Sequence, residues 1–117
     1  MEQTYKGSCH CGAVSYKVET ELKDVISCNC SICAKRGHIL AFAPAAKFEL
    51  LSGSDNLTDY QFGSGNIHHL FCKTCGVNSF AEGHMPDGSE MRAINVRCLE
   101  GVDIESLEVT PVNGKDF

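Results

Sequence analysis

Seven of the eight cysteines in this chain fall into three short groups, and these groups constrain its fold more than any other feature. They lie in the segments CHC at 9–11, CNCSIC at 28–33 and CKTC at 72–75. Two cysteines separated by one residue are poorly placed to form a disulfide with each other, but both can bind one metal ion. We therefore interpret the groups as metal ligands, with disulfides or free core cysteines as the alternative.

Length, charge and the N-terminal residues define the context of these cysteines. A chain of 117 residues predicts a single domain over 1–117, and its net charge of −5 gives no support for a nucleic-acid partner. No apolar run approaches the roughly 20 residues that cross a bilayer, so no membrane partner is expected. The first residues lack the apolar segment of a secretory signal, so we expect a cytoplasmic protein, in which cysteine groups are more often metal sites than bridges.

The four-coordinate preference of zinc divides the cysteines into two sites. The first is a structural zinc held by two knuckles, each followed by a glycine that can take the positive φ of a tight turn. Its ligands are Cys9, Cys11, Cys72 and Cys75. Because the two knuckles are far apart in the sequence, a shared zinc would join an early hairpin to a later one.

The second predicted zinc has three ligands within six residues: Cys28, Cys30 and Cys33. Three protein ligands and an open fourth position are typical of a zinc that binds a ligand or takes part in chemistry. In the alternative, Cys98 or one of the histidines completes this site and makes it structural too. The sequence thus predicts two zinc ions in the chain.

Short stretches of alternating apolar and polar residues predict a mostly β fold of short antiparallel strands. The expected strands are 13–18, 38–43, 48–51, 58–62, 68–71, 77–81 and 91–96, and the expected turns between them are 51–56, 63–66 and 85–89. Short helical turns are expected at 31–36 and 104–107.

Lys35 and Arg36 follow the three-cysteine group closely. They would attract a substrate carboxylate, and a solvated turn is the alternative interpretation. Cys98 follows Arg97 in an apolar segment and is expected to be a buried, inert thiol; a ligand or reactive residue is the alternative.

The histidines are weaker candidates. His10 lies between two predicted ligands, so its side chain should point away from the metal. His68 and His69 are adjacent on an expected strand and must face opposite sides of it. His38 and His84 lie near strand ends; ordinary core or solvated positions are expected, with a place in a cleft as the alternative.

Residues 7–14 (GSCHCGAV), 28–33 (CNCSIC) and 71–76 (FCKTCG) resemble the glutathione-dependent formaldehyde-activating enzyme (GFA) family, which includes the centromere protein V (CENP-V) domain. The resemblance extends through 51–53 (LSG) and 95–99 (NVRCL) and covers nearly the whole chain. It implies one β-tent domain over 1–117, the same four-cysteine structural zinc, and a second zinc on Cys28, Cys30 and Cys33. The chain departs from the family at its end, where Phe117 stands in place of a tryptophan that relatives often carry.

The resemblance also implies a function. The named family activity joins glutathione, a small-molecule thiol, to formaldehyde and gives S-hydroxymethylglutathione, formally a carbon–sulfur lyase reaction. The second zinc would bind the thiol, which makes its three cysteines the catalytic group. Two alternatives from other classes stay open: a non-catalytic thiol carrier, and a structural zinc module for protein–protein interaction.

Overall fold

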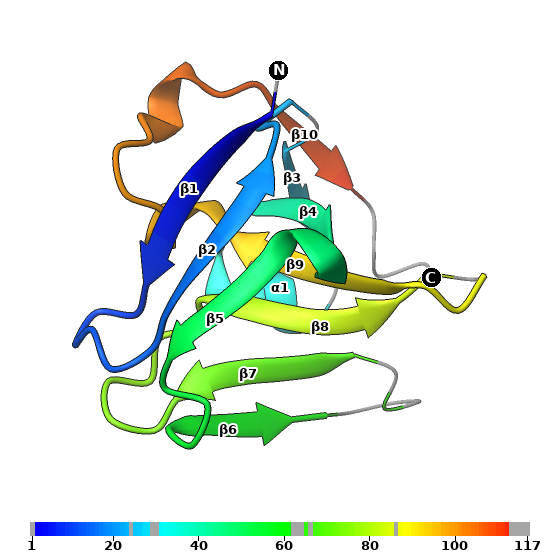
Figure 1. The fold of residues 1–117 in the computed structure, drawn as a ribbon. Coiled ribbons are helices and arrows are strands. Elements are labelled where there is room, and N and C mark those ends of the chain that lie inside the picture. The colour runs from blue at the N-terminus through cyan, green and yellow to red at the C-terminus, as the bar shows by residue number, and fades with distance from the viewer. Residues whose placement is uncertain are drawn as a thin grey trace.

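The computed structural model describes residues 2–23, 25–28, 31–61, 65, 67–85 and 87–112, and within these ranges the chain is mostly β (Figure 1). None of the helices in these ranges is long and apolar enough to cross a membrane. The strands are β1 Gln3–Ser8, β2 Ser15–Thr20, β3 Val25–Cys28, β4 Leu40–Pro44, β5 Phe48–Ser52, β6 Leu57–Tyr60, β7 His68–Cys72, β8 Phe80–His84, β9 Glu90–Asn95 and β10 Val109–Val112. The helical segments are α1 Ser31–Arg36 and the 3₁₀ turns η1 Ala45–Lys47, η2 Val96–Cys98 and η3 Ile104–Ser106.

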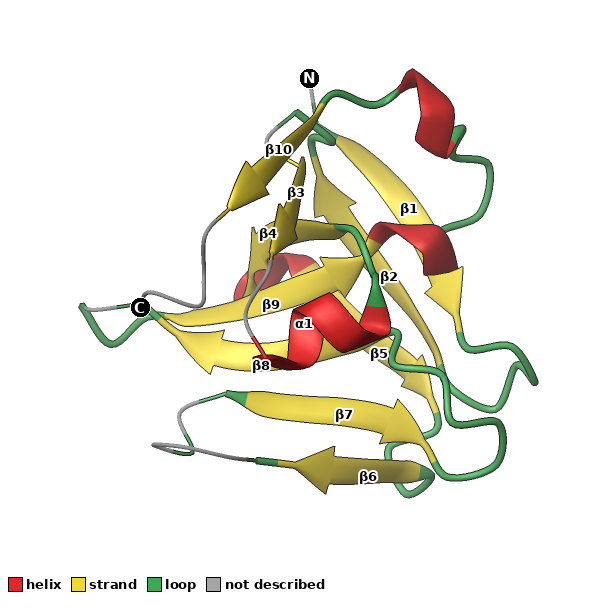
Figure 2. Cartoon of the chain, turned by 180° about the vertical axis from the view of Figure 1, so that it is seen from behind, coloured by secondary structure: helices red, strands yellow, loops and turns green. Residues whose placement is uncertain are grey.

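The strands form two sheets that cover each other. A three-stranded sheet has the order β1-β2-β5, and a seven-stranded sheet has the order β10-β3-β4-β9-β8-β7-β6. Neighbouring strands are antiparallel, as predicted, except that β10 pairs with β3 in parallel. The small sheet crosses in front of the large one in Figure 1, and α1 lies on the opposite face of the large sheet in Figure 2.

The core lies between the two sheets and is built around three aromatic rings. Tyr16 stacks on Phe48 with ring centroids 5.0 Å apart, and Phe80 meets both rings, at 5.6 Å from Tyr16 and 4.7 Å from Phe48. The Tyr16 hydroxyl donates a hydrogen bond of 3.0 Å to the Ser79 carbonyl, so the one polar atom of this fully buried side chain is satisfied. Ile94 on the large sheet is also fully buried.

Most predicted elements are present within a few residues, and the helical turn at 31–36 is confirmed as α1. The strand predicted at 77–81 begins only at Phe80, because the Asn78 side chain donates to the carbonyls of Leu70 and Phe80 and forms an irregular link before β8. β1, β3 and β10 were not predicted. Residue 62 of the strand predicted at 58–62 lies outside the described residues, as do 63, 64 and 66 of the turn predicted at 63–66.

Candidate functional site

Cys9, Cys11, Cys72 and Cys75 come together as one cluster, here called the first cysteine group. Their sulfur atoms all lie within 4.8 Å of one another, and none of the four residues forms a disulfide. The Cys11 sulfur is 3.6 Å from the sulfurs of both Cys9 and Cys72. A tetrahedral ion with metal–sulfur bonds of about 2.3 Å places its sulfurs about 3.8 Å apart. The first cysteine group could therefore hold a metal ion.

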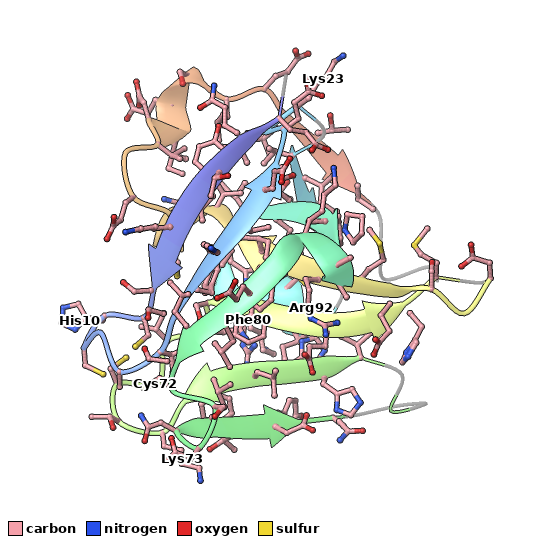
Figure 3. All side chains as sticks on the ribbon, viewed as in Figure 1. His10, Lys23, Cys72, Lys73, Phe80 and Arg92 are labelled. Carbon is pink, nitrogen blue, oxygen red and sulfur yellow. The ribbon has the colours of Figure 1, made fainter. Side chains whose placement is uncertain are left out.

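Two tight turns bring these sulfurs together. The Gly12 N–H donates to the Cys9 carbonyl at 3.3 Å, and the Gly76 N–H donates to the Cys72 carbonyl at 2.9 Å. Both glycines have positive φ, of 83° and 80°, which confirms the expectation from the sequence. One turn follows β1 of the small sheet and the other follows β7 of the large sheet, so the first cysteine group joins the two sheets (Figure 3).

Several N–H groups point at the sulfur atoms of the first cysteine group. The Thr74 and Cys75 backbone N–H groups donate to the Cys72 sulfur at 3.3 and 3.5 Å. The Asn56 side-chain amide donates to the same sulfur at 3.4 Å and also to the Thr74 hydroxyl at 3.1 Å. Such hydrogen bonds orient metal ligands and stabilise the thiolate form. Asn56 lies in the turn predicted at 51–56, but no sequence pattern indicated its contact with Cys72.

The surroundings of the first cysteine group favour the ionisation of some of its thiols more than that of others. The backbone N–H groups of Cys11 and Val77 lower the pKa of Cys75 to about 6. For Cys11 the Ala13 N–H acts in the same direction, but loss of hydration and the neighbouring sulfurs outweigh it and raise the pKa to about 11. Four thiolates this close repel one another, so a divalent cation is what would let all four ionise together.

The second cysteine group consists of Cys28, Cys30 and Cys33, and the structure describes only part of it. Cys28 ends β3 and Cys33 lies in α1, whereas Cys30 lies outside the described residues. The three-cysteine site therefore stays a prediction from the sequence. The His38 ring lies beside the described part of the group, with its Nε2 atom 3.4 Å from the Cys33 sulfur.

His38 is buried, and its Nδ1 atom has no hydrogen-bond partner. Burial lowers its pKa, and the charges of Arg36 and then of His69 lower it further, so the ring is neutral at pH 7. The sequence favoured an ordinary position for His38. Its contact with Cys33 therefore went unpredicted, although a histidine five positions after a cysteine is close enough in sequence to share a metal ion with it.

His69 lies on the face of the large sheet that carries α1. It belongs to a row of paired residues on one face, which runs through Phe42, Ala93, Ala81, His69 and Tyr60. Burial is the main cause of its lowered pKa, and the charge of Arg36 also contributes. His68 points to the other side and pairs with Asp59 at 2.7 Å, so the prediction that the two histidines face opposite sides is confirmed.

The other candidate residues from the sequence differ in how exposed their side chains are. His10 is exposed and points away from the first cysteine group, as predicted (Figure 3). Lys35 is exposed, whereas Arg36 is half-buried and its Nη1 atom is buried without a hydrogen-bond partner. The charge of Arg36 acts on both His38 and His69.

Cys98 is half-buried, and burial raises the pKa of its thiol to about 11, with further contributions from Cys9 and Cys75. Such a thiol is a poor nucleophile at neutral pH, in agreement with the expected inert role. Two cysteines of the first cysteine group thus act electrostatically on Cys98. Among the residues considered as a fourth ligand of the second group, His38 is therefore the better placed, since it contacts Cys33.

Two comparisons with known proteins agree with this arrangement. A crystal structure of a Rhodobacter sphaeroides protein is similar to this chain, with a TM-score of 0.82 and 40% sequence identity, and the match covers 92% of this chain and 99% of that one. The family model for the glutathione-dependent formaldehyde-activating enzyme matches residues 4–112, which include all three cysteine groups. The chain therefore belongs to the glutathione-dependent formaldehyde-activating enzyme family.

Proposed function

We propose that this protein is a zinc-dependent enzyme of the carbon–sulfur lyase type that joins a thiol such as glutathione to formaldehyde or a similar aldehyde. In this reaction the thiol sulfur forms a bond to the carbonyl carbon, the C=O π bond breaks, and the thiol proton ends on the new hydroxyl oxygen. The observation that carries the proposal is the family match over residues 4–112. The cleavage of the adduct is the same step in reverse.

The proposal assigns the two cysteine groups different tasks. The first cysteine group would hold a structural zinc, since its sulfur spacing fits a tetrahedral thiolate site and its four ligands leave no position for a substrate. The second cysteine group would hold a zinc with a position that a substrate thiol can take. Zinc supplies one chemical effect there: it lowers the pKa of a bound thiol, so that the sulfur reacts as thiolate.

Arg36 and Lys35 would bind the carboxylates of the substrate. Arg36 is the better candidate for this role, because its buried Nη1 atom lacks a hydrogen-bond partner and a carboxylate oxygen would supply one. Lys35 is exposed on α1 and would add attraction at longer range. Water or a histidine on this face would deliver the proton to the new hydroxyl oxygen.

The test combines metal analysis with exchange kinetics. Purified protein should contain two zinc ions, and adding it to glutathione and ¹³C-formaldehyde should accelerate the exchange between free aldehyde and adduct in NMR exchange spectra. Cys33→Ser should lose one zinc and the acceleration, whereas Cys98→Ser, the matched control, should keep both. Circular dichroism checks that the variants remain folded.

The alternatives predict different results from the same measurements. If glutathione raises the melting temperature but the exchange rate equals the uncatalysed rate, the protein is a thiol carrier. If it holds a single zinc and glutathione has no effect, it is a structural module for protein–protein interaction. Either outcome would overturn the proposed enzyme.

A further inference from the structure

We propose that a cavity between β5 and the large sheet binds a small uncharged molecule with an apolar body and a hydrogen-bond acceptor. The cavity lies on the face of the large sheet that meets the small sheet, whereas α1, which carries Cys33, lies on the opposite face (Figure 2). The proposed ligand site is therefore separate from the proposed reaction, and neither depends on the other.

The cavity has a volume of about 460 Å³, and both sheets contribute its walls. Its apolar side chains come from strands β5, β6, β7 and β8, and they are Phe48, Leu50, Leu57, Leu70 and Phe80. β5 and β6 are edge strands, each the last in its sheet. In Figure 3 the labelled Phe80 and Arg92 lie between β5 and β7. Apolar cavities of several hundred cubic ångströms are typical of small-molecule sites.

The walls of this cavity favour an apolar ring as the body of the ligand. All of the five apolar side chains except Phe80 are only partly buried, so they expose apolar surface to water. A molecule that fills the cavity would remove this surface from water, which the hydrophobic effect favours. Two of the walls are the rings of Phe48 and Phe80, with centroids 4.7 Å apart, and a third ring can pack against them edge-to-face or offset.

Arg92 supplies a hydrogen-bond donor to the lining. Its Cζ atom lies 6.0 Å from the centroid of the Phe48 ring. Nη1 donates to the Met91 carbonyl at 3.3 Å, and Nη2 lies 3.1 Å from a carboxylate oxygen of Glu82. The third donor, Nε, is buried and has no hydrogen-bond partner within the described part of the chain. Because an unpaired buried donor is costly, an acceptor atom on the ligand would be favoured here.

The charges around the cavity favour an uncharged ligand. The Arg92 side chain is only 15% exposed, and Glu82 already pairs with its charge. His68 pairs with Glu82 across the strands and contacts Asp59 at 2.7 Å, so a second carboxylate lies nearby. A ligand carboxylate would have to displace Glu82, and a ligand ammonium group would meet the guanidinium. Both would also lose hydration, whereas an amide or ketone carbonyl avoids these costs.

Three probes that share a benzyl group test the inference on the full-length, metal-loaded protein. They are phenylacetamide, which is uncharged, phenylacetate and phenethylammonium. The methyl signals of Leu50, Leu57 and Leu70 are followed in ¹H–¹³C NMR spectra during each titration. Phenylacetamide should shift these signals with a dissociation constant of about 1 mM, and each charged probe should bind at least about tenfold more weakly.

Two pairs of variants locate the binding site. Leu50→Phe places extra volume in the cavity and should weaken phenylacetamide binding at least about tenfold, whereas Leu51→Phe, at an exposed position on the other side of β5, should leave it unchanged. Arg92→Lys keeps the charge but removes the Nε N–H, so binding should weaken about fivefold. Arg97→Lys, at an exposed position, is its control. Circular dichroism checks that each variant is folded.

Three results would overturn the inference. If phenylacetamide at about 10 mM shifts none of the three leucine signals, the cavity is not a site for this class of molecule. If phenylacetate or phenethylammonium binds more tightly than phenylacetamide, the ligand is a charged one. If Leu50→Phe and Leu51→Phe bind phenylacetamide equally well, the molecule binds elsewhere. None of these measurements involves glutathione or the second cysteine group, so each of these results leaves the proposed function standing.

Discussion

At the scale of single residues, the core shows how a polar atom fixes the packing of the two sheets. The Tyr16 ring contacts both Phe48 and Phe80, and its hydroxyl donates a hydrogen bond to the Ser79 carbonyl. An apolar ring of the same shape would fill the space equally well. The hydrogen bond of the hydroxyl therefore fixes the orientation of the Tyr16 ring, which the hydrophobic effect alone would leave less specific.

Replacing Tyr16 by Phe tests this contact. The substitution keeps the ring but leaves the buried Ser79 carbonyl without its partner, so we expect a loss of about 1–2 kcal/mol in the free energy of unfolding. Tyr5→Phe is the matched control, since Tyr5 is only partly buried and should change stability by less than about 0.5 kcal/mol. Urea unfolding of the metal-loaded proteins measures both, and equal stability of the two variants would contradict the expectation.

At the scale of elements, the sequence predicts best where the chemistry is local. α1 and the two glycine turns follow from neighbouring residues, and they occur where expected. β1 was missed because most of it is exposed and its alternation is weak. β3 and β10 are four residues each, too short for a clear pattern, and their parallel pairing joins distant segments.

For the candidate site too, the features that depend on cysteine spacing were predictable, whereas the contacts that depend on the fold were not. The first cysteine group was predictable because zinc demands four ligands and the spacing of the knuckles supplies them. The contact between His38 and Cys33 depends on how Gly37 turns the chain after α1, and the amide of Asn56 reaches Cys72 only because β6 pairs with β7. Side-chain contacts of this kind need the three-dimensional fold and cannot be derived from spacing.

The glycine turn after Cys75 offers a prediction at this scale. Gly76 has a φ of 80°, and an added β-carbon there would meet nothing within 4 Å, so Gly76→Ala would suffer backbone strain alone. We expect a loss of about 1–2 kcal/mol in unfolding free energy and weaker metal retention, because the turn orients Cys75. Gly83→Ala is the control: that glycine has no positive φ, and an added methyl would meet its nearest neighbour at 3.7 Å. The prediction fails if both variants retain wild-type stability in thermal unfolding.

At the scale of the whole molecule, the first cysteine group links the two sheets through the turns that follow β1 and β7. Removing its metal should release these two turns from each other. We expect a chelator to lower the free energy of unfolding by several kcal/mol, up to about 10, since structural zinc contributes on this order in small domains. Calorimetry with and without chelator measures the change, and Cys98→Ser should respond as wild type does. An unchanged melting temperature after complete metal removal would rule out this role.

Acid should reproduce the effect of the chelator, and the direction follows from the thiols. Protons compete with the metal for all four sulfurs, so stability linked to the metal is present at neutral pH and is lost as the pH falls. The N–H groups of Cys11 and Val77 hold the pKa of Cys75 at about 6, below the value of about 8.5 expected in the unfolded chain. Since a bound cation favours all four thiolates, zinc release should accompany acidification below neutral pH. Zinc release and the loss of β-sheet circular dichroism, followed together as the pH is lowered from neutral, should coincide. A loss of the β-sheet signal at a higher pH than zinc release would contradict this expectation, and so would zinc release that leaves the β-sheet signal unchanged. Either result would show that something other than the first cysteine group holds the two sheets together.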